Sequence, residues 1–167
     1  MFVSKINKIT MNKILFICGS LNQTTMMHKI SMHLSGHKHF FTPYYGDNIV
    51  NFLAENSYLD FTILGGKFKQ DTLKYLTANN LNIDYKGLNN DYDLIITCSD
   101  LIVPRNILHK KIILVQEGMT DPENFLFYAV KYLKFPRFIA STSTTGLSDC
   151  YEKFCVASEG YKSIFYK

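Results

Sequence analysis

Short runs of apolar residues, separated by segments with helical periodicity, form the main pattern of this chain. Four runs are apolar on both faces: Lys13–Cys18, Leu94–Cys98, Lys111–Gln116 and Phe138–Ala140. Uninterrupted runs are typical of strands buried on both sides, as in a parallel sheet covered by helices. A fifth run, His39–Tyr45, contains Pro43, and a proline inside a strand favours the edge of a sheet or a strand end.

The segments between these runs have apolar residues at helical spacing. Met27, Ile30 and Leu34 follow the i, i+3, i+7 pattern, which predicts a helix from about Thr24 to Leu34. Two further helices are expected at Asn48–Tyr58 and Lys69–Asn79. Another helix should start at Thr120–Glu123, and its apolar residues are Phe125, Ala129, Tyr132 and Leu133. A strand at Phe154–Ala157 and a last helix from Glu159 complete the pattern. This alternation predicts an α/β fold with a doubly wound, mostly parallel sheet and helices on both faces.

Composition narrows the class of protein. Of the 167 residues, 47% are hydrophobic and 19% are charged, as expected of one globular domain. The net charge of +4 comes from scattered lysines, so we predict no nucleic-acid binding. No apolar stretch approaches the length of about 18 residues that indicates a transmembrane helix, while contact with a membrane surface stays open.

The cysteines and histidines show no pattern of a metal site. Cys18, Cys98, Cys150 and Cys155 form no C-x-x-C pair, and most lie in apolar runs. Free cysteines in such runs behave as small core residues, which favours a reducing, cytoplasmic setting. No histidine forms an i, i+4 metal pair with a carboxylate, and we predict neither a metal nor a cofactor.

In open α/β sheets, ligands bind outside the carboxyl ends of the strands. After the first strand, a polar turn leads into a helix N-terminus, which could hold an anion or a sugar hydroxyl. Its candidate ligand-binding residues are Gly19, Ser20, Asn22 and Thr24, with His28 on the flank of the helix. An ordinary strand–helix turn with a threonine cap, and a surface histidine, explain the same residues.

Two carboxylates follow neighbouring strands. Ser99 and Asp100 come after the second deep strand, and Glu117 comes after the third. Carboxylates that share a crevice can differ in pKa, as acid and base chemistry requires. We expect Glu117 to be the catalytic group, because Asp121 and Glu123 already serve the next helix start. Asp100 would assist, although an aspartate also commonly caps a turn.

A loop rich in hydroxyl groups follows the fourth predicted strand. Ser141, Thr142, Ser143 and Thr144 precede Gly146. Such a loop can cradle a phosphate or a sugar, and it can equally be a plain surface connection, which is the more common case.

Five segments together resemble the N-terminal half of a bacterial, two-domain glycosyltransferase-like family. They are ILFICGSLNQTTMMHKI, HFFTPYYGD, YDLIITCSDLIVPRNI, KKIILVQEGMTDPENF and ASTSTTGLSDCYEKFCVASEGY, within residues 11–167. The family has the glycosyltransferase B-type fold and is akin to UDP-N-acetylglucosamine 2-epimerases and CDP-glycerol glycerophosphotransferases. The resemblance implies a Rossmann-like lobe on the acceptor side. In it, Glu117 resembles a strand-end glutamate of the epimerases and Asp100 their upstream acid.

The same resemblance implies that a C-terminal lobe binds most of the nucleotide-sugar donor, so this lobe alone would be inactive. The apolar helical face that begins at Tyr161 stops at Lys167, which is typical of a truncated domain. Residues 1–10 are either an N-terminal extension or a short ordered arm. The alternatives to the enzyme lobe are a stand-alone, flavodoxin-like module that binds a phosphate-bearing ligand and a non-functional gene remnant. Epimerisation and group transfer both stay open, and no oligomeric state is predicted.

Overall fold

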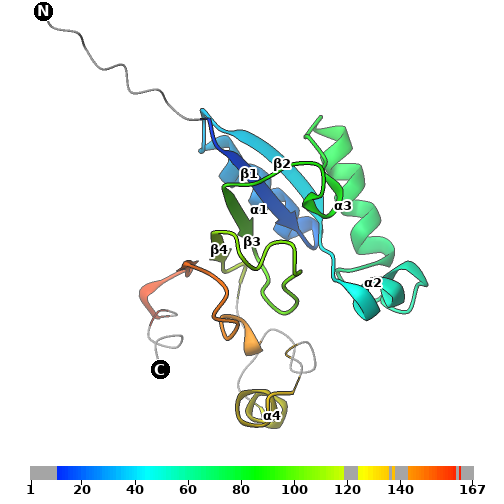
Figure 1. Cartoon of the computed structure of the whole chain (residues 1–167), viewed down its shortest axis with the longest axis vertical. Coiled ribbons are helices and arrows are strands. Elements are labelled where there is room, and N and C mark those ends of the chain that lie inside the picture. The colour runs from blue at the N-terminus through cyan, green and yellow to red at the C-terminus, as the bar shows by residue number, and fades with distance from the viewer. Residues whose placement is uncertain (1–10, 119–123, 136, 138–142, 161, 163–167) are drawn as a thin grey trace, which may run out of the picture.

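The computed structural model describes residues 11–118, 124–135, 137, 143–160 and 162. Its five strands form one sheet in the order β2-β1-β3-β4-β5, and every pairing is parallel. The strands are β1 (Lys13–Cys18), β2 (Lys38–Pro43), β3 (Leu94–Thr97), β4 (Ile112–Val115) and β5 (Lys153–Cys155). The predicted doubly wound α/β fold is confirmed (Figure 1).

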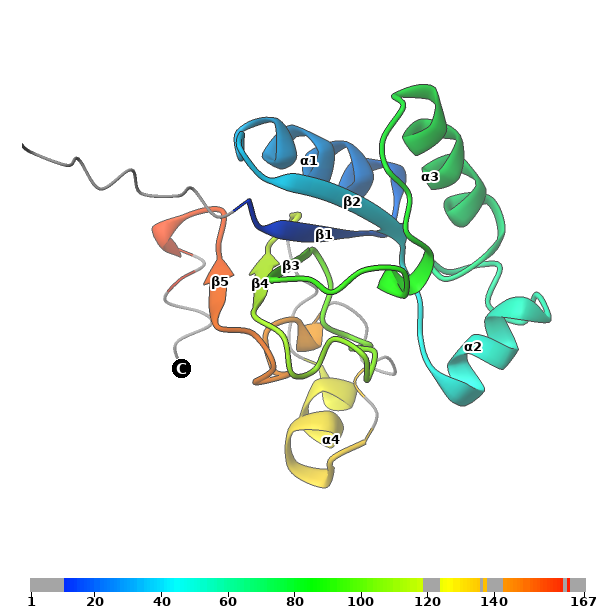
Figure 2. The same cartoon turned by 45° about the horizontal axis from the view of Figure 1, so that its top comes forward.

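Helices and a long loop cover the two faces of this sheet. The helices are α1 (Leu21–Met32), α2 (Asn48–Glu55), α3 (Gly66–Ala78) and α4 (Phe125–Leu133), with a 3-10 turn, η1, at Tyr85–Gly87. α1 and α3 lie together on one face, while α4 lies apart on the other side (Figure 2). The loop between β3 and β4 and the apolar side of α2 pack on that second face.

The side chains of β1 alternate between two cores, because successive residues of a strand point to opposite faces. Ile14 and Phe16 pack with Met27 of α1 and Leu76 of α3. Leu15 and Ile17 pack on the other face with a group that includes Tyr44, Tyr45, Ile95, Ile107 and Ile112. Both faces of β1 are therefore buried, which explains its uninterrupted apolar run.

Several boundaries differ from those that the pattern predicts. β2 is an edge strand, as its proline indicates, and it ends at Pro43 rather than Tyr45. β5 begins one residue before the predicted strand and pairs with β4. The strand predicted at Phe138–Ala140 lies outside the described residues, as do Thr120–Glu123 at the predicted helix start. α4 begins at Phe125, where the Asn124 side chain accepts a hydrogen bond from the backbone N–H of Phe127 at 3.0 Å.

Candidate functional site

A capping box joins the end of β1 to the start of α1. The backbone N–H of Gln23 donates to Ser20 Oγ at 3.3 Å, and the N–H of Ser20 donates to Gln23 Oε1 at 3.0 Å. The helix therefore begins at Leu21, not near Thr24. The spacing Ser20-x-x-Gln23 is a sequence signal for a helix start, and the prediction overlooked it. A Cβ at position 19 would lie 1.7 Å from Gln23 Oε1, so the glutamine side chain of the capping box would have to move.

Glu117 meets this capping box from the end of β4. Gln23 Nε2 donates to Glu117 Oε2 at 2.7 Å, and Ser20 Oγ donates to Glu117 Oε1 at 3.4 Å. The carboxyl ends of parallel strands lie at one edge of a sheet, so the contact follows from the topology even though 97 residues separate Ser20 from Glu117. A carboxylate is also stabilised near a helix N-terminus. Two of the predicted site residues, Ser20 and Glu117, are thus brought together.

The Glu117 side chain keeps capacity to bind a ligand. The residue is exposed, and an ionised carboxylate offers about four acceptor positions, of which Ser20 and Gln23 use two. The remaining positions suit a hydroxyl donor. A phosphate at the same place would be repelled, because the protein's own negative charge already lies at the start of α1.

Two of the predicted ligand-binding residues of α1, Thr24 and His28, contact α3 rather than Glu117. Thr24 is fully buried, donates to the Ser20 carbonyl oxygen at 2.7 Å and lies 3.1 Å from the hydroxyl of Thr72 in α3. His28 is one turn further along α1, where its Nδ1 lies 3.0 Å from the Tyr75 hydroxyl. Both side chains join α1 to α3, and the structure does not bring either of them to Glu117; their ligand-binding roles stay predictions. Asn22 is exposed in the first turn of α1 and stays a candidate.

Asp100 binds its own chain. Its side chain is 2% exposed and accepts hydrogen bonds from Arg137 Nη1 at 2.9 Å and from the backbone N–H groups of Gly146 at 3.1 Å and Ser148 at 3.2 Å. Within the described part of the chain, no contact joins Asp100 to Glu117. The two carboxylates therefore do not form the shared acid–base pair that their positions after neighbouring strands predict.

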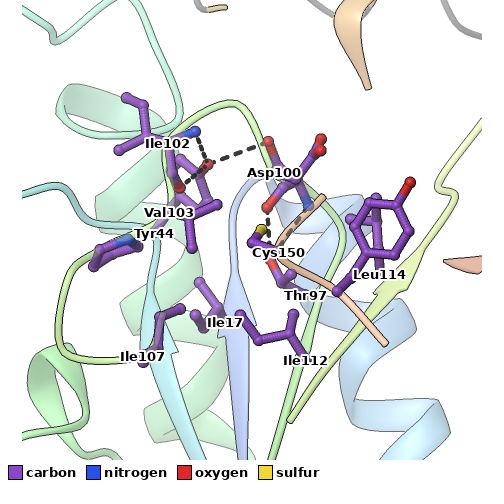
Figure 3. A pocket seen from close by; sticks show the side chains of 13 residues that line it. Ile17, Tyr44, Thr97, Asp100, Ile102, Val103, Ile107, Ile112, Leu114 and Cys150 are labelled. Carbon is purple, nitrogen blue, oxygen red and sulfur yellow. Dashed lines mark hydrogen bonds between the residues drawn. The ribbon is translucent and has the colours of Figure 1, made fainter. Parts of the chain in front are cut away.

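The cavity beside Asp100 is too small for a substrate. It measures about 10 Å³ and is walled by apolar side chains of β1, β4 and the loop after β3 (Figure 3), so it could hold at most about one water molecule. Burial raises the pKa of Tyr44 to about 12, so the phenol stays neutral and donates to the Ile102 carbonyl oxygen at 2.8 Å. Tyr44 also donates to Ser99 Oγ at 3.3 Å, which places Ser99 in this inner network.

The described half of the hydroxyl-rich loop faces inward. Ser143 and Thr144 are buried, and Thr144 Oγ1 donates to the Arg137 carbonyl oxygen at 3.1 Å. These two residues form no open cradle, because the loop is drawn inward by the contacts of Asp100 with Gly146 and Ser148. Ser141 and Thr142 lie outside the described residues.

Fold and site together define a doubly wound α/β protein with an exposed carboxylate at the carboxyl edge of its sheet. The part of the chain that the structure describes contains no group of three or more metal-ligating side chains. Among its helices, none has the length and apolar character needed to cross a membrane. No protein-family model, curated protein or solved structure matches the chain. The resemblance to the glycosyltransferase-like family therefore stays a prediction.

Proposed function

We propose that the chain is the acceptor-side lobe of a sugar-nucleotide-dependent glycosyltransferase or epimerase-like enzyme, with Glu117 as its general base. One observation carries the proposal. The Glu117 carboxylate is exposed at the end of β4, and Ser20 and Gln23 hold it by two hydrogen bonds. A catalytic base needs this combination of fixed orientation and free acceptor capacity.

Glu117 would accept a proton in either of the two reactions. In a transfer reaction, an acceptor hydroxyl would donate to Glu117 and attack the anomeric carbon, while the bond to the nucleotide breaks and its electron pair leaves with the phosphate. In an epimerisation, the same carboxylate would remove a proton from a carbon of the sugar, and return of a proton to the opposite face of that carbon would invert it. The donor would lie on a second lobe, so we expect the chain alone to bind an acceptor-like sugar without turnover.

The test is a titration of the ¹⁵N-labelled chain with N-acetylglucosamine and, separately, with glycerol. We expect amide shifts to concentrate at Ser20, Gln23 and Gly118. Glu117→Gln keeps the size of the side chain and one acceptor oxygen for Gln23, but it removes the charge and places an NH₂ group beside Ser20 Oγ, which can accept from it. Loss of one charge-assisted hydrogen bond should weaken binding about tenfold or more.

Glu152→Gln is the matched control. Glu152 is exposed and precedes β5, so it lies at the opposite edge of the parallel sheet from Glu117. We expect this variant to bind as the wild type does. Unchanged binding by Glu117→Gln, or shifts confined to residues away from the α1 start, would contradict the proposal.

Strand order favours a second candidate, a flavodoxin-like binding module without catalysis. The order β2-β1-β3-β4-β5 is that of flavodoxin-like sheets, whose phosphate-bearing ligand lies between the ends of β1 and β3. Titration with flavin mononucleotide distinguishes the two candidates. For a phosphate ligand, Glu117→Gln should strengthen binding, because it removes a like charge from the start of α1.

A further inference from the structure

Ser20 and Glu117 form a hydroxyl–carboxylate pair at the carboxyl edge of the sheet. Ser20 Oγ donates to Glu117 Oε1 at 3.4 Å, and Gln23 Nε2 holds the other carboxylate oxygen at 2.7 Å. A hydroxyl within reach of a base that a third group orients is the arrangement of an activated serine nucleophile. Catalytic hydrogen bonds are often as long as this one before a substrate binds. The pair therefore fits covalent catalysis as well as the removal of a proton from a bound ligand.

Ser20 lies in the turn that joins a buried parallel strand to a helix. β1 ends at Cys18 and α1 begins at Leu21, and Ser20 between them is partly exposed to solvent. A strand–turn–helix connection of this kind presents the nucleophilic serine of α/β-hydrolases, where the N–H of the next residue helps to bind the oxyanion. The local sequence Cys18-Gly19-Ser20 is not the G-x-S-x-G pattern of those enzymes, so the likeness is one of geometry.

The first turn of α1 supplies donors for an oxyanion. The N–H of Gln23 donates to Ser20 Oγ at 3.3 Å, and that of Thr24 donates to the Ser20 carbonyl oxygen at 2.9 Å. Among the described residues, none accepts a hydrogen bond from the N–H groups of Leu21 or Asn22, and both residues are exposed. These two groups lie at the positive end of the helix dipole. They can therefore stabilise the charge that develops on a carbonyl oxygen when Ser20 attacks it.

We propose that Ser20 is a nucleophile that takes acyl groups from small carboxylic esters, with Glu117 as its base. The inference shares this base with the proposed function and adds a second reaction at the same site.

The reaction has two steps, as in other serine nucleophiles. Ser20 Oγ attacks the ester carbonyl carbon while its proton passes to the Glu117 carboxylate, and the oxyanion forms against the N–H groups of Leu21 and Asn22. The bond to the alcohol oxygen then breaks, and the alcohol leaves with the proton from Glu117. In the second step, water attacks the acyl carbon and gives a proton to Glu117, the acid is released, and Ser20 Oγ takes that proton back. Glu117 is exposed, so water can reach it for this step.

The test is incubation of the full chain with p-nitrophenyl acetate and, separately, with a fluorophosphonate probe, which bonds to an activated serine as fluoride leaves. We expect catalytic release of p-nitrophenolate, and mass spectrometry of the digested protein should find the probe on Ser20. Glu117→Gln should slow both reactions about a hundredfold or more, as expected for loss of a general base. Ser20→Asn keeps a side chain that caps α1 but has no nucleophilic hydroxyl, so it should lose both reactions.

Ser35→Ala is the matched control and should react as the wild type does, because Ser35 is exposed beyond the C-terminal end of α1. Circular dichroism checks that each variant stays folded. Absence of labelling in the wild-type chain, labelling that Ser20→Asn retains, or equal rates for the wild type and Glu117→Gln would overturn the proposal.

The same measurements separate this inference from the proposed function. Amide shifts with N-acetylglucosamine in a chain that the probe does not label would overturn the nucleophile and leave the sugar site. A label on Ser20 in a chain that shows no shifts with either acceptor would support the nucleophile and contradict the sugar site.

Discussion

Replacement of Asp100 by asparagine should destabilise the fold more than replacement of any exposed carboxylate. The carboxylate accepts from Arg137 Nη1 and from the N–H groups of Gly146 and Ser148. All three donate to Oδ2, so an asparagine oxygen in its place keeps these contacts, while the NH₂ group takes the place of Oδ1, to which the Gly146 N–H also donates at 3.2 Å. Arg137 then loses its ion pair, and the Gly146 N–H meets a donor group in a buried place.

The structure bounds the size of this effect. Removal of one partner from a buried ion pair costs about 3–5 kcal/mol. The Arg137 side chain is 21% exposed, so water compensates part of the loss, and we expect about 3 kcal/mol for Asp100→Asn. For a chain of this length, that loss corresponds to a decrease in Tm of about 10 °C.

The assay is urea unfolding followed by circular dichroism, with Asp91→Asn as the control. Asp91 forms an ion pair with Lys110, but its side chain is 89% exposed, so its replacement should leave the unfolding midpoint almost unchanged. The double variant Asp100→Asn, Arg137→Gln should lose less free energy of unfolding than the two single variants added together. Strict additivity, or an Asp100→Asn protein within about 1 kcal/mol of the wild type, would refute the reasoning.

Three further predictions concern other sites. Burial by itself would raise the pKa of Asp84, but hydrogen bonds from a tyrosine hydroxyl, asparagine side chains and backbone N–H groups lower it below its ordinary value. The stabilisation that this carboxylate gives the fold is therefore present at neutral pH and is lost as the pH falls through the lowered pKa. We expect the urea midpoint of Asp84→Asn to fall less than that of the wild type between neutral pH and about pH 3. Burial raises the pKa of Cys18 to about 12, whereas Cys155 is exposed. A thiol reagent should therefore label Cys155 quickly and Cys18 only after unfolding, and mass spectrometry of the labelled protein measures both. Gly19→Ala should displace the capping glutamine and lower the free energy of unfolding by about 1 kcal/mol, whereas Gly118→Ala, where an added Cβ meets nothing within 4 Å, should have no effect in the same urea assay.

The fold was predictable because its signals are local. β1 ends where its apolar run ends, and the proline of β2 indicates an edge. The contact between Ser20 and Glu117 was also within reach, since both follow parallel strands whose carboxyl ends share one edge of the sheet.

Burial of polar side chains was not predictable, because it depends on contacts between distant segments. Thr24 has the local pattern of a cap but lies against Thr72, 48 residues later. Ser143 and Thr144 look like an exposed loop until Asp100, more than 40 residues earlier, binds Gly146. α4 shows the converse. Phe125, Ala129 and Leu133 have the helical spacing of a core face, yet only Ala129 of the three is buried, together with Phe127 and Val130.

The two strand-end carboxylates show how surroundings divide roles between chemically similar groups. Asp100 directs its acceptor positions to Arg137 and backbone N–H groups, so an incoming proton donor would have to displace bonds that hold the fold together. Glu117 accepts from Ser20 and Gln23 and stays open to solvent. A base must accept a proton without unfolding its own site. On this argument, a loss of ligand binding in Asp100→Asn should accompany its loss of stability, whereas Glu117→Gln should lose binding in a protein as stable as the wild type.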